Sequence, residues 1–188
     1  MRLENSFEVP AAPEAAWSLL LDVPRVVPCM PGAELTETVD ESTWKAKLNV
    51  KLGPISLSFA TDVKREEADE AARRVRLSAD AREVRGRGAA RATIESSLAP
   101  VADGTRIDVV TDLSMSGAVA QYGRGLIEDV SSRLLQSFAD CLRAQLSAAT
   151  AAEAEAAVAA QARPVSGLSL VFAALGRAIA RLFGRRSQ

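Results

Sequence analysis

The side chains that carry most enzyme chemistry are scarce in this chain of 188 residues. It contains no histidine, which removes the commonest general base, the commonest metal ligand and every Ser-His or Cys-His catalytic pair. Its two cysteines, Cys29 and Cys141, are too few for a multi-cysteine zinc or iron–sulfur site. We therefore expect no catalytic residue and no metal site.

The cysteines also bear on where the protein works. The N-terminal segment MRLENSFEVP lacks the apolar stretch of a signal peptide. We expect a cytoplasmic protein with free thiols, although two cysteines are also compatible with one disulfide. Cys29 has no histidine to activate it, and its nearest base in sequence is Arg25, so we do not expect a nucleophile.

Two features could contact a small molecule. Tyr122, the only tyrosine, lies on the apolar side of a predicted helix. Its hydroxyl could donate to a ligand carbonyl, or it could bond to the backbone of a packed core. Residues 28–32 hold two of three closely spaced prolines together with the soft side chain of Met30. They could form the lip of a cavity or a stiff connector.

Alternating apolar and polar residues predict the elements that must position these groups. Residues 3–9 read as a half-buried strand, and helical spacing follows in residues 13–21. Six more alternating segments are separated by short turns such as Gly53-Pro54 and Asp103-Gly104, so they should pair as antiparallel neighbours. These segments are residues 34–39, 44–51, 55–67, 74–82, 90–98 and 107–113.

The period then changes, because residues 117–149 read as one long amphipathic helix. Its apolar positions include Val119, Tyr122, Leu126, Val130, Leu134, Phe138, Cys141 and Leu142. We predict an α+β helix-grip fold, in which a curved antiparallel sheet of about seven strands wraps around this long C-terminal helix. Small inward alanines such as Ala79 and Ala90 either leave an apolar cavity or allow close helix packing.

If a cavity exists, the alternation and the helical stripe indicate which side chains reach it. The expected ligand-binding residues are Leu57, Phe59, Leu77, Ile94, Val109, Tyr122, Leu126, Val130, Leu134 and Met30. Four arginines gather around one predicted hairpin, namely Arg82, Arg85, Arg87 and Arg91. They could form a docking patch for a partner or a solvated hairpin tip. The body's net negative charge argues against a nucleic-acid face.

The C-terminal part differs from the body in composition. Residues 151–188 hold five of the 23 Lys and Arg but only two of the 24 Asp and Glu. We divide the chain into a ligand-binding domain (1–147), an Ala-rich linker (148–164) and a basic amphipathic tail helix (165–188). The linker could be semi-rigid or could extend the long helix.

The tail reads as an interfacial membrane helix, because apolar side chains lie opposite evenly spaced arginines. Its contact residues are Leu168, Phe172, Leu175, Arg177, Ile179, Arg181, Leu182, Phe183 and Arg185. The uncharged run, residues 165–176, is too short to span a bilayer, which needs about 20 residues. The alternatives are docking in a groove of a partner enzyme, or packing against the chain's own body.

Several motifs together resemble the family of CoxG, a subunit of carbon monoxide dehydrogenase, within the START-like SRPBCC superfamily. The motifs cover about residues 1–146, and none of them lies in the tail. They are LENSF at residue 3, the segment from Trp17 to Asp22, PCMPGAEL at 28, KLGP at 51, GRG at 86, TDL at 111 and QYGRG at 121.

The resemblance implies a helix-grip fold with an apolar ligand cavity, and an accessory role beside a molybdenum hydroxylase such as carbon monoxide dehydrogenase. It implies no catalytic residue and no covalent cofactor. We expect the ligand to be an isoprenoid quinone such as menaquinone, or a lipid, and the protein to be peripheral at the inner membrane. The alternative is an assembly factor or membrane recruiter without a functional ligand. A cyclase or hydrolase is a third, weaker reading.

Overall fold

The computed structural model describes residues 1–52, 55–121 and 123–148, and the expected linker and tail beyond residue 148 lie outside them. β1 (Arg2–Val9) is followed by α1 (Pro13–Leu21), α2 (Val23–Val26) and the 3₁₀ turn η1 (Val27–Cys29). The remaining strands are β2 (Ala33–Thr38), β3 (Thr43–Leu52), β4 (Ile55–Asp69), β5 (Arg74–Glu83), β6 (Gly88–Val101) and β7 (Gly104–Gly117). The 3₁₀ turn η2 (Ala118–Gln121) leads into α3 (Arg124–Ser147).

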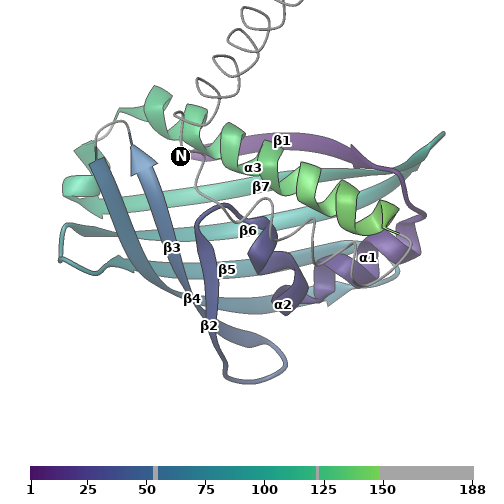
Figure 1. Ribbon diagram of the computed structural model, residues 1–188, viewed down its shortest axis with the longest axis horizontal. Helices are drawn as coiled ribbons and strands as arrows, with labels where there is room; N and C mark the ends of the chain where they lie inside the picture. Colours follow the sequence, from purple (N-terminus) through teal and green to yellow (C-terminus); the bar gives the residue numbers. More distant parts are fainter. Residues whose placement is uncertain (53–54, 122, 149–188) are drawn as a thin grey trace, which may run out of the picture.

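The seven strands form one antiparallel sheet in the order β1-β7-β6-β5-β4-β3-β2. The sheet is a run of hairpins, and β1 adds to its far edge by pairing with β7. Figure 1 shows the sheet curving around α3, which lies across one face while α1 and α2 close one end. The predicted helix-grip architecture is therefore confirmed.

The main core lies under the C-terminal half of α3. Phe138 meets Phe7 of β1 edge to face, with ring centroids 6.2 Å apart. Trp17 of α1 and Leu142 of α3 are buried in the same cluster, together with Ile107 of β7. A smaller cluster of Leu57, Phe59 and Val119 lies under the N-terminal half of the helix. The helix therefore rests on a large core at one end and a small one at the other.

Two features of the helix region differ from the expectations. The helix begins at Arg124 rather than near Gly117, because Gly117 has a φ of +71° and Gly123 is extended, with a ψ of 150°. Helical residues cannot adopt those angles, so the intervening segment forms η2 instead. The long helix α3 ends at Ser147, because the backbone of Ala148 is extended.

The expectation of free thiols is wrong. Cys29 and Cys141 are joined by a disulfide, and both side chains are fully buried. The bond links η1 to the C-terminal half of α3. Chain topology brings these cysteines together from positions 112 residues apart, a pairing that the sequence spacing does not reveal.

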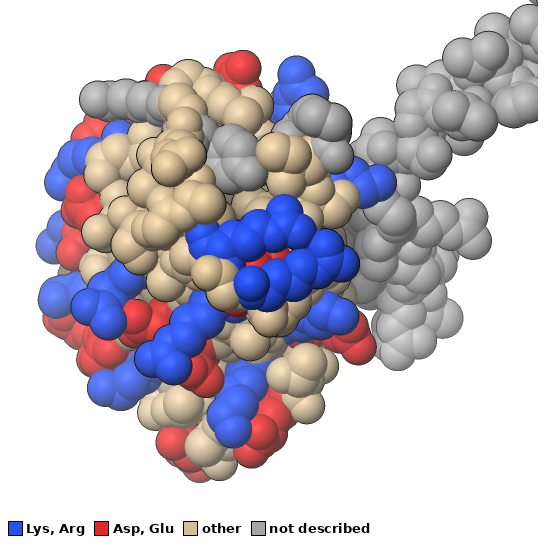
Figure 2. Space-filling view, turned by 90° about the vertical axis from the view of Figure 1, so that its left-hand side faces the viewer, with Lys and Arg blue, Asp and Glu red and all other residues tan. Residues whose placement is uncertain are grey.

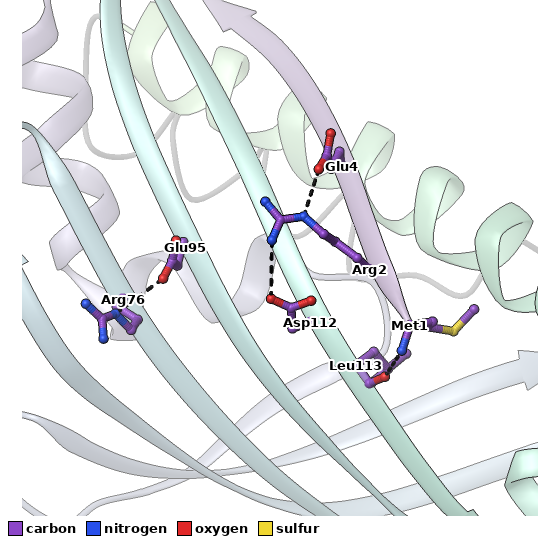
Figure 3. A network of polar contacts seen from close by, with 7 residues as sticks. All are labelled: Met1, Arg2, Glu4, Arg76, Glu95, Asp112 and Leu113. Atoms are coloured by element: carbon purple, nitrogen blue, oxygen red, sulfur yellow. Dashed lines mark hydrogen bonds and ion pairs between the residues drawn. The ribbon is translucent and has the colours of Figure 1, made fainter.

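Polar contacts also fix the N-terminal edge strand. The amino group of Met1 donates to the carbonyl oxygen of Leu113, and Arg2 bridges Glu4 and Asp112 on the outer face (Figure 3). Arg76 pairs with Glu95 nearby. These exposed ion pairs contribute little to stability individually. They show that the outer face is polar, so the apolar face is the one turned toward α3.

Candidate ligand-binding site

An apolar hollow of about 130 Å³ lies between the sheet and the N-terminal half of α3. It is lined by Val50, Leu57, Phe59, Ala90, Leu113, Met115, Val119, Ile127, Val130, Ser131 and Leu134. All are apolar except Ser131, so a molecule held here would be selected by apolar contact, with one hydroxyl available for a hydrogen bond. No ionisable side chain is among these residues.

Strand register builds the floor of the hollow. Val50 of β3 is directly opposite Leu57 of β4, and Ala90 of β6 is opposite Met115 of β7. Directly opposed residues project from the same face of a sheet, and residues two apart along a strand share that face. Phe59 therefore lies beside Leu57 on the inner surface. The alternating pattern of the sequence places these residues inward, and the register brings them together.

Helical spacing builds the roof. Ile127, Val130, Ser131 and Leu134 of α3 follow the i, i+3, i+4, i+7 pattern of one helical face. Val119 of η2 lines the hollow from the end next to α3 and is buried. A Cβ added at Gly123 or Gly125, at the start of α3, would meet no atom of a more distant residue within 4 Å in the part of the chain that the structure describes.

The β5–β6 turn lies beside Val119 at the same end of the hollow. The carboxylate of Glu83, opposite Phe59, is buried and accepts the backbone N–H groups of Arg85 at 2.9 Å and Arg87 at 3.1 Å. Burial alone would raise the pKa of Glu83, but these hydrogen bonds and the positive charge of Arg87 lower it below its ordinary value. The carbonyl of Arg87 in turn accepts the N–H of Val119.

The structure divides the residues expected to bind ligand into three groups. Leu57, Phe59, Val130 and Leu134 line the hollow. Leu77, Ile94, Val109 and Met30 do not, because they pack in or against the main core at the other end of α3. Leu126 is 38% exposed and is not among the residues that line the hollow. Tyr122 lies outside the described residues.

The proline-rich loop is likewise placed elsewhere. Its Cys29 is bonded to the C-terminal half of α3, and its Met30 packs against the main core. The expectation that residues 28–32 form the lip of the cavity is therefore wrong for this hollow, and the loop serves as a fixed connector. Seven residues that line the hollow were not among the expected ligand-binding residues, namely Val50, Ala90, Leu113, Met115, Val119, Ile127 and Ser131. Alternation marks Met115 as inward, but only the register shows which inward residues share one space.

Comparison with known proteins identifies the family. The profile for CoxG, a subunit of carbon monoxide dehydrogenase, matches residues 6–147. This chain belongs to the CoxG family. The match ends where α3 ends and leaves the C-terminal segment uncovered. A search of curated proteins found no match.

Solved structures support the fold of this CoxG-family chain. A conserved protein from Geobacillus kaustophilus is 20% identical, with a TM-score of 0.70, over 78% of this chain and 95% of that one. A START superfamily protein from Mycobacterium smegmatis is 17% identical, with a TM-score of 0.52, over 77% and 96%. The Zhui aromatase/cyclase from Streptomyces sp. R1128 is 14% identical, with a TM-score of 0.52, over 88% and 96%.

Two searches of the described residues bear on other kinds of site. Within residues 1–52, 55–121 and 123–148, no group of His, Cys, Asp and Glu side chains could hold a metal ion. Over the same residues, no helix is long and apolar enough to cross a membrane.

Proposed function

We propose that this chain is a non-enzymatic accessory protein that holds an apolar ligand in the hollow beneath α3. The ligand is an isoprenoid quinone such as menaquinone, or a lipid. The protein links a molybdenum hydroxylase of the carbon monoxide dehydrogenase type to the membrane respiratory chain. The name of the family supports the enzyme partner. An oxidising enzyme needs an electron acceptor, and an apolar carrier that resides in the membrane meets that need.

The lining of the hollow carries this proposal. Ten of the side chains that surround it are apolar, and the eleventh is a serine. Its volume of about 130 Å³ is close to that of an apolar cavity of about 150 Å³ that binds benzene. It is smaller than the roughly 300–1,000 Å³ of pockets that enclose drug-sized ligands. The hollow therefore admits one ring, and a longer molecule requires α3 to shift outward.

The N-terminal half of α3, which covers the hollow, is the half that can shift at the lower cost in free energy. Its C-terminal half is held by the disulfide and the main core, whereas its N-terminal half rests on the small cluster of Leu57, Phe59 and Val119. Separating fewer buried contacts costs less free energy, so the end over the hollow opens first. Ser131 on that end could donate a hydrogen bond to a quinone carbonyl.

We place the protein at the cytoplasmic face of the inner membrane, with residues 165–188 as its interfacial helix. Read as a helix, the sequence of this tail would bring its large apolar residues to one face and its arginines to another. In the cytoplasm, the disulfide must resist the reducing thiol pool. Full burial of both sulfurs supports that resistance, because exchange needs access for an attacking thiolate.

The experiment that tests the proposal is native mass spectrometry of the full chain purified from its own organism, followed by organic extraction. We expect one apolar species of constant identity, close to one per chain. Sub-stoichiometric lipid of varying identity would contradict the carrier. It would favour the second candidate, a recruiter or assembly factor without a functional ligand, which the small volume of the hollow supports.

A further inference from the structure

The two ends of the sheet carry opposite charge. Antiparallel hairpins alternate, so the β3–β4 and β5–β6 turns share one end with η2 and the start of α3. The β2–β3, β4–β5 and β6–β7 turns share the other end. Five acidic residues are exposed at that second end, namely Asp40, Glu41, Asp69, Glu70 and Asp103, and they outnumber the three basic residues there, Arg73, Arg74 and Arg106. The first end, which holds the hollow, is basic.

The basic end has a defined set of side chains, which we call the rim. The rim consists of Lys51, Arg82, Val84, Arg85, Arg87 and Leu126. Figure 2 faces this end and shows Lys and Arg gathered in the middle beside an uncharged area. Arg82 and Arg85 are exposed and form no ion pair with any residue in the described ranges. Their charge is available to a partner.

Acidic groups near the rim offset only part of this charge. Glu83 is buried and engaged by the N–H groups of its own turn, and Asp80 pairs with Arg91 at 2.6 Å. On α3, Glu128 and the exposed Asp129 follow Leu126 by two and three residues, so the acidic charge near the rim lies on the helix and not in the β5–β6 turn. The tip of the turn thus stays positive.

Exposed apolar side chains accompany the basic ones. Val84, next to Arg85 in the turn, is 58% exposed, and Leu126 in the first turn of α3 is 38% exposed. Both are at the end where Val119 and Ile127 line the hollow. An apolar tip among unpaired arginines fits the boundary between lipid headgroups and acyl chains, where arginine meets anionic lipid and valine enters the apolar layer.

We propose that the rim docks on an anionic lipid bilayer and holds the opening of the hollow against it. This inference rests on the proposed function, because a bilayer is the source of an apolar membrane-resident ligand. The acidic far end points into the cytoplasm in this orientation. The rim acts in addition to the tail, which tethers the chain without fixing which face meets the membrane.

A site-specific probe in the full chain separates rim contact from tethering. The variant Val84→Cys is labelled with nitrobenzoxadiazole, whose fluorescence rises in an apolar environment. The disulfide leaves no other reactive thiol among the described residues. The matched control is Val39→Cys, because Val39 is 47% exposed and lies in the acidic β2–β3 turn. Vesicles contain phosphatidylcholine with or without phosphatidylglycerol.

We expect fluorescence at position 84 to rise with phosphatidylglycerol vesicles and to fall back at high salt, while position 39 does not respond. Replacing Arg82 or Arg85 with glutamine should weaken the response about fivefold each, the effect of removing one basic side chain from an anionic surface. Arg74→Gln, at the other end of β5, should leave it unchanged. Equal responses at positions 84 and 39, or none, would overturn the proposal.

Two further outcomes are diagnostic. A response at position 84 to a purified molybdenum hydroxylase but not to vesicles would make the rim a protein interface and overturn the membrane assignment. Ligand content of the same variants, measured by extraction and mass spectrometry, separates this inference from the proposed function. If the probe at position 84 responds to vesicles but the protein never contains ligand, the docking surface is supported and the proposed carrier function is contradicted.

Discussion

Cys29 and Cys141 join the short η1 turn to the C-terminal half of α3 through a fully buried disulfide. The side chain of Gln145 lies beside this bond, with its Nε2 donating to the carbonyl oxygen of Arg25 at 3.1 Å and lying 3.0 Å from Cys29 Sγ. One end of the helix is thereby fixed to the loop that precedes β2. The hollow lies beneath the other end, so the disulfide anchors α3 without restricting the half that must move for a ligand.

Removing the disulfide should cost substantial stability. The loop that it closes spans 112 positions, and the chain-entropy model assigns about 4–5 kcal/mol to a loop of that size. We expect the double variant Cys29→Ala, Cys141→Ala to lose about that amount in the free energy of unfolding, measured by urea denaturation. Reduced wild-type protein is the control and should behave like the variant. Two maleimide-reactive thiols in the unreduced, denatured chain would contradict the disulfide.

Glu83 should make the β5–β6 turn sensitive to acid. Its pKa is lowered in the folded protein, despite the opposing effect of burial, so its contribution to stability is present above the unfolded pKa of about 4.3 and disappears as the pH falls through the folded value. We expect Glu83→Gln to be less stable than wild type at neutral pH, with the difference shrinking in acid. Urea unfolding at a series of pH values measures this. Glu34→Gln, at an exposed position of β2, is the matched control variant.

Two nearby glycines should respond differently to alanine. Gly88 has a φ of +146°, and a Cβ there would lie 2.2 Å from the carbonyl oxygen of Ser116 and 2.8 Å from Val119 Cγ2. Gly86 has a φ of +73° with open space around it. We expect Gly86→Ala to cost about 1–2 kcal/mol from backbone strain alone, and Gly88→Ala to cost clearly more. Thermal unfolding compares them, and equal losses would show that the close contacts with Ser116 and Val119 relax freely.

Filling the hollow should remove the ligand without unfolding the protein. Val130 lines the space and Leu126, four residues earlier on α3, is exposed. We expect Val130→Trp to abolish ligand content while lowering the free energy of unfolding by no more than about 1–3 kcal/mol, the usual cost of added bulk, because the indole enters existing space. Leu126→Trp should keep its ligand. Mass spectrometry of both variants provides the measurement, and retention of ligand by Val130→Trp would place the site elsewhere.

The sequence predicts the fold well because the fold depends on local periodicity. Alternation along strands such as Trp44 to Val50, and the helical stripe from Val130 to Leu142, are properties of neighbouring residues. The site depends on which inward residues share one space, and that is decided by register and by the path of α3. Val109 and Leu57 are both inward and apolar, yet the first packs in the main core and the second lines the hollow.

The disulfide and the start of α3 escaped prediction for similar reasons. Cys29 and Cys141 are brought together by the topology of the whole chain. The spacing of residues in the sequence predicts only contacts between residues that are close in sequence. The apolar pattern continues at helical period through Gly117 and Gly123, but the backbone angles of these glycines are not helical. Periodicity alone gives no information about backbone angles. Glycine positions were the available signal, because glycine weakens a helix by about 1 kcal/mol relative to alanine.

Deleting residues 165–188 should leave a folded body. The sheet and α3 form a two-layer core within residues 1–148, and the family profile ends at residue 147. We expect the truncated protein to unfold at the same urea concentration as the full chain. It should sediment with anionic vesicles far less than the full chain does, because the rim alone provides only a few basic side chains. Loss of the folded state on truncation would show that the tail packs against the body.

Within the tail, replacing the basic side chains and replacing the apolar side chains should weaken vesicle binding in different ways. Replacing Arg177, Arg181 and Arg185 with glutamine should weaken vesicle binding mainly at low salt, because charges at a surface are screened within about 8–10 Å at physiological ionic strength. Replacing Phe172 and Leu175 with serine should weaken it at every salt concentration, because burial of apolar area is not screened. Co-sedimentation across a salt series distinguishes the two patterns. The opposite result would be that the full chain does not sediment with vesicles, whereas a synthetic peptide of residues 165–188 binds the purified hydroxylase. In that case the tail is a docking helix for the enzyme and not a membrane anchor.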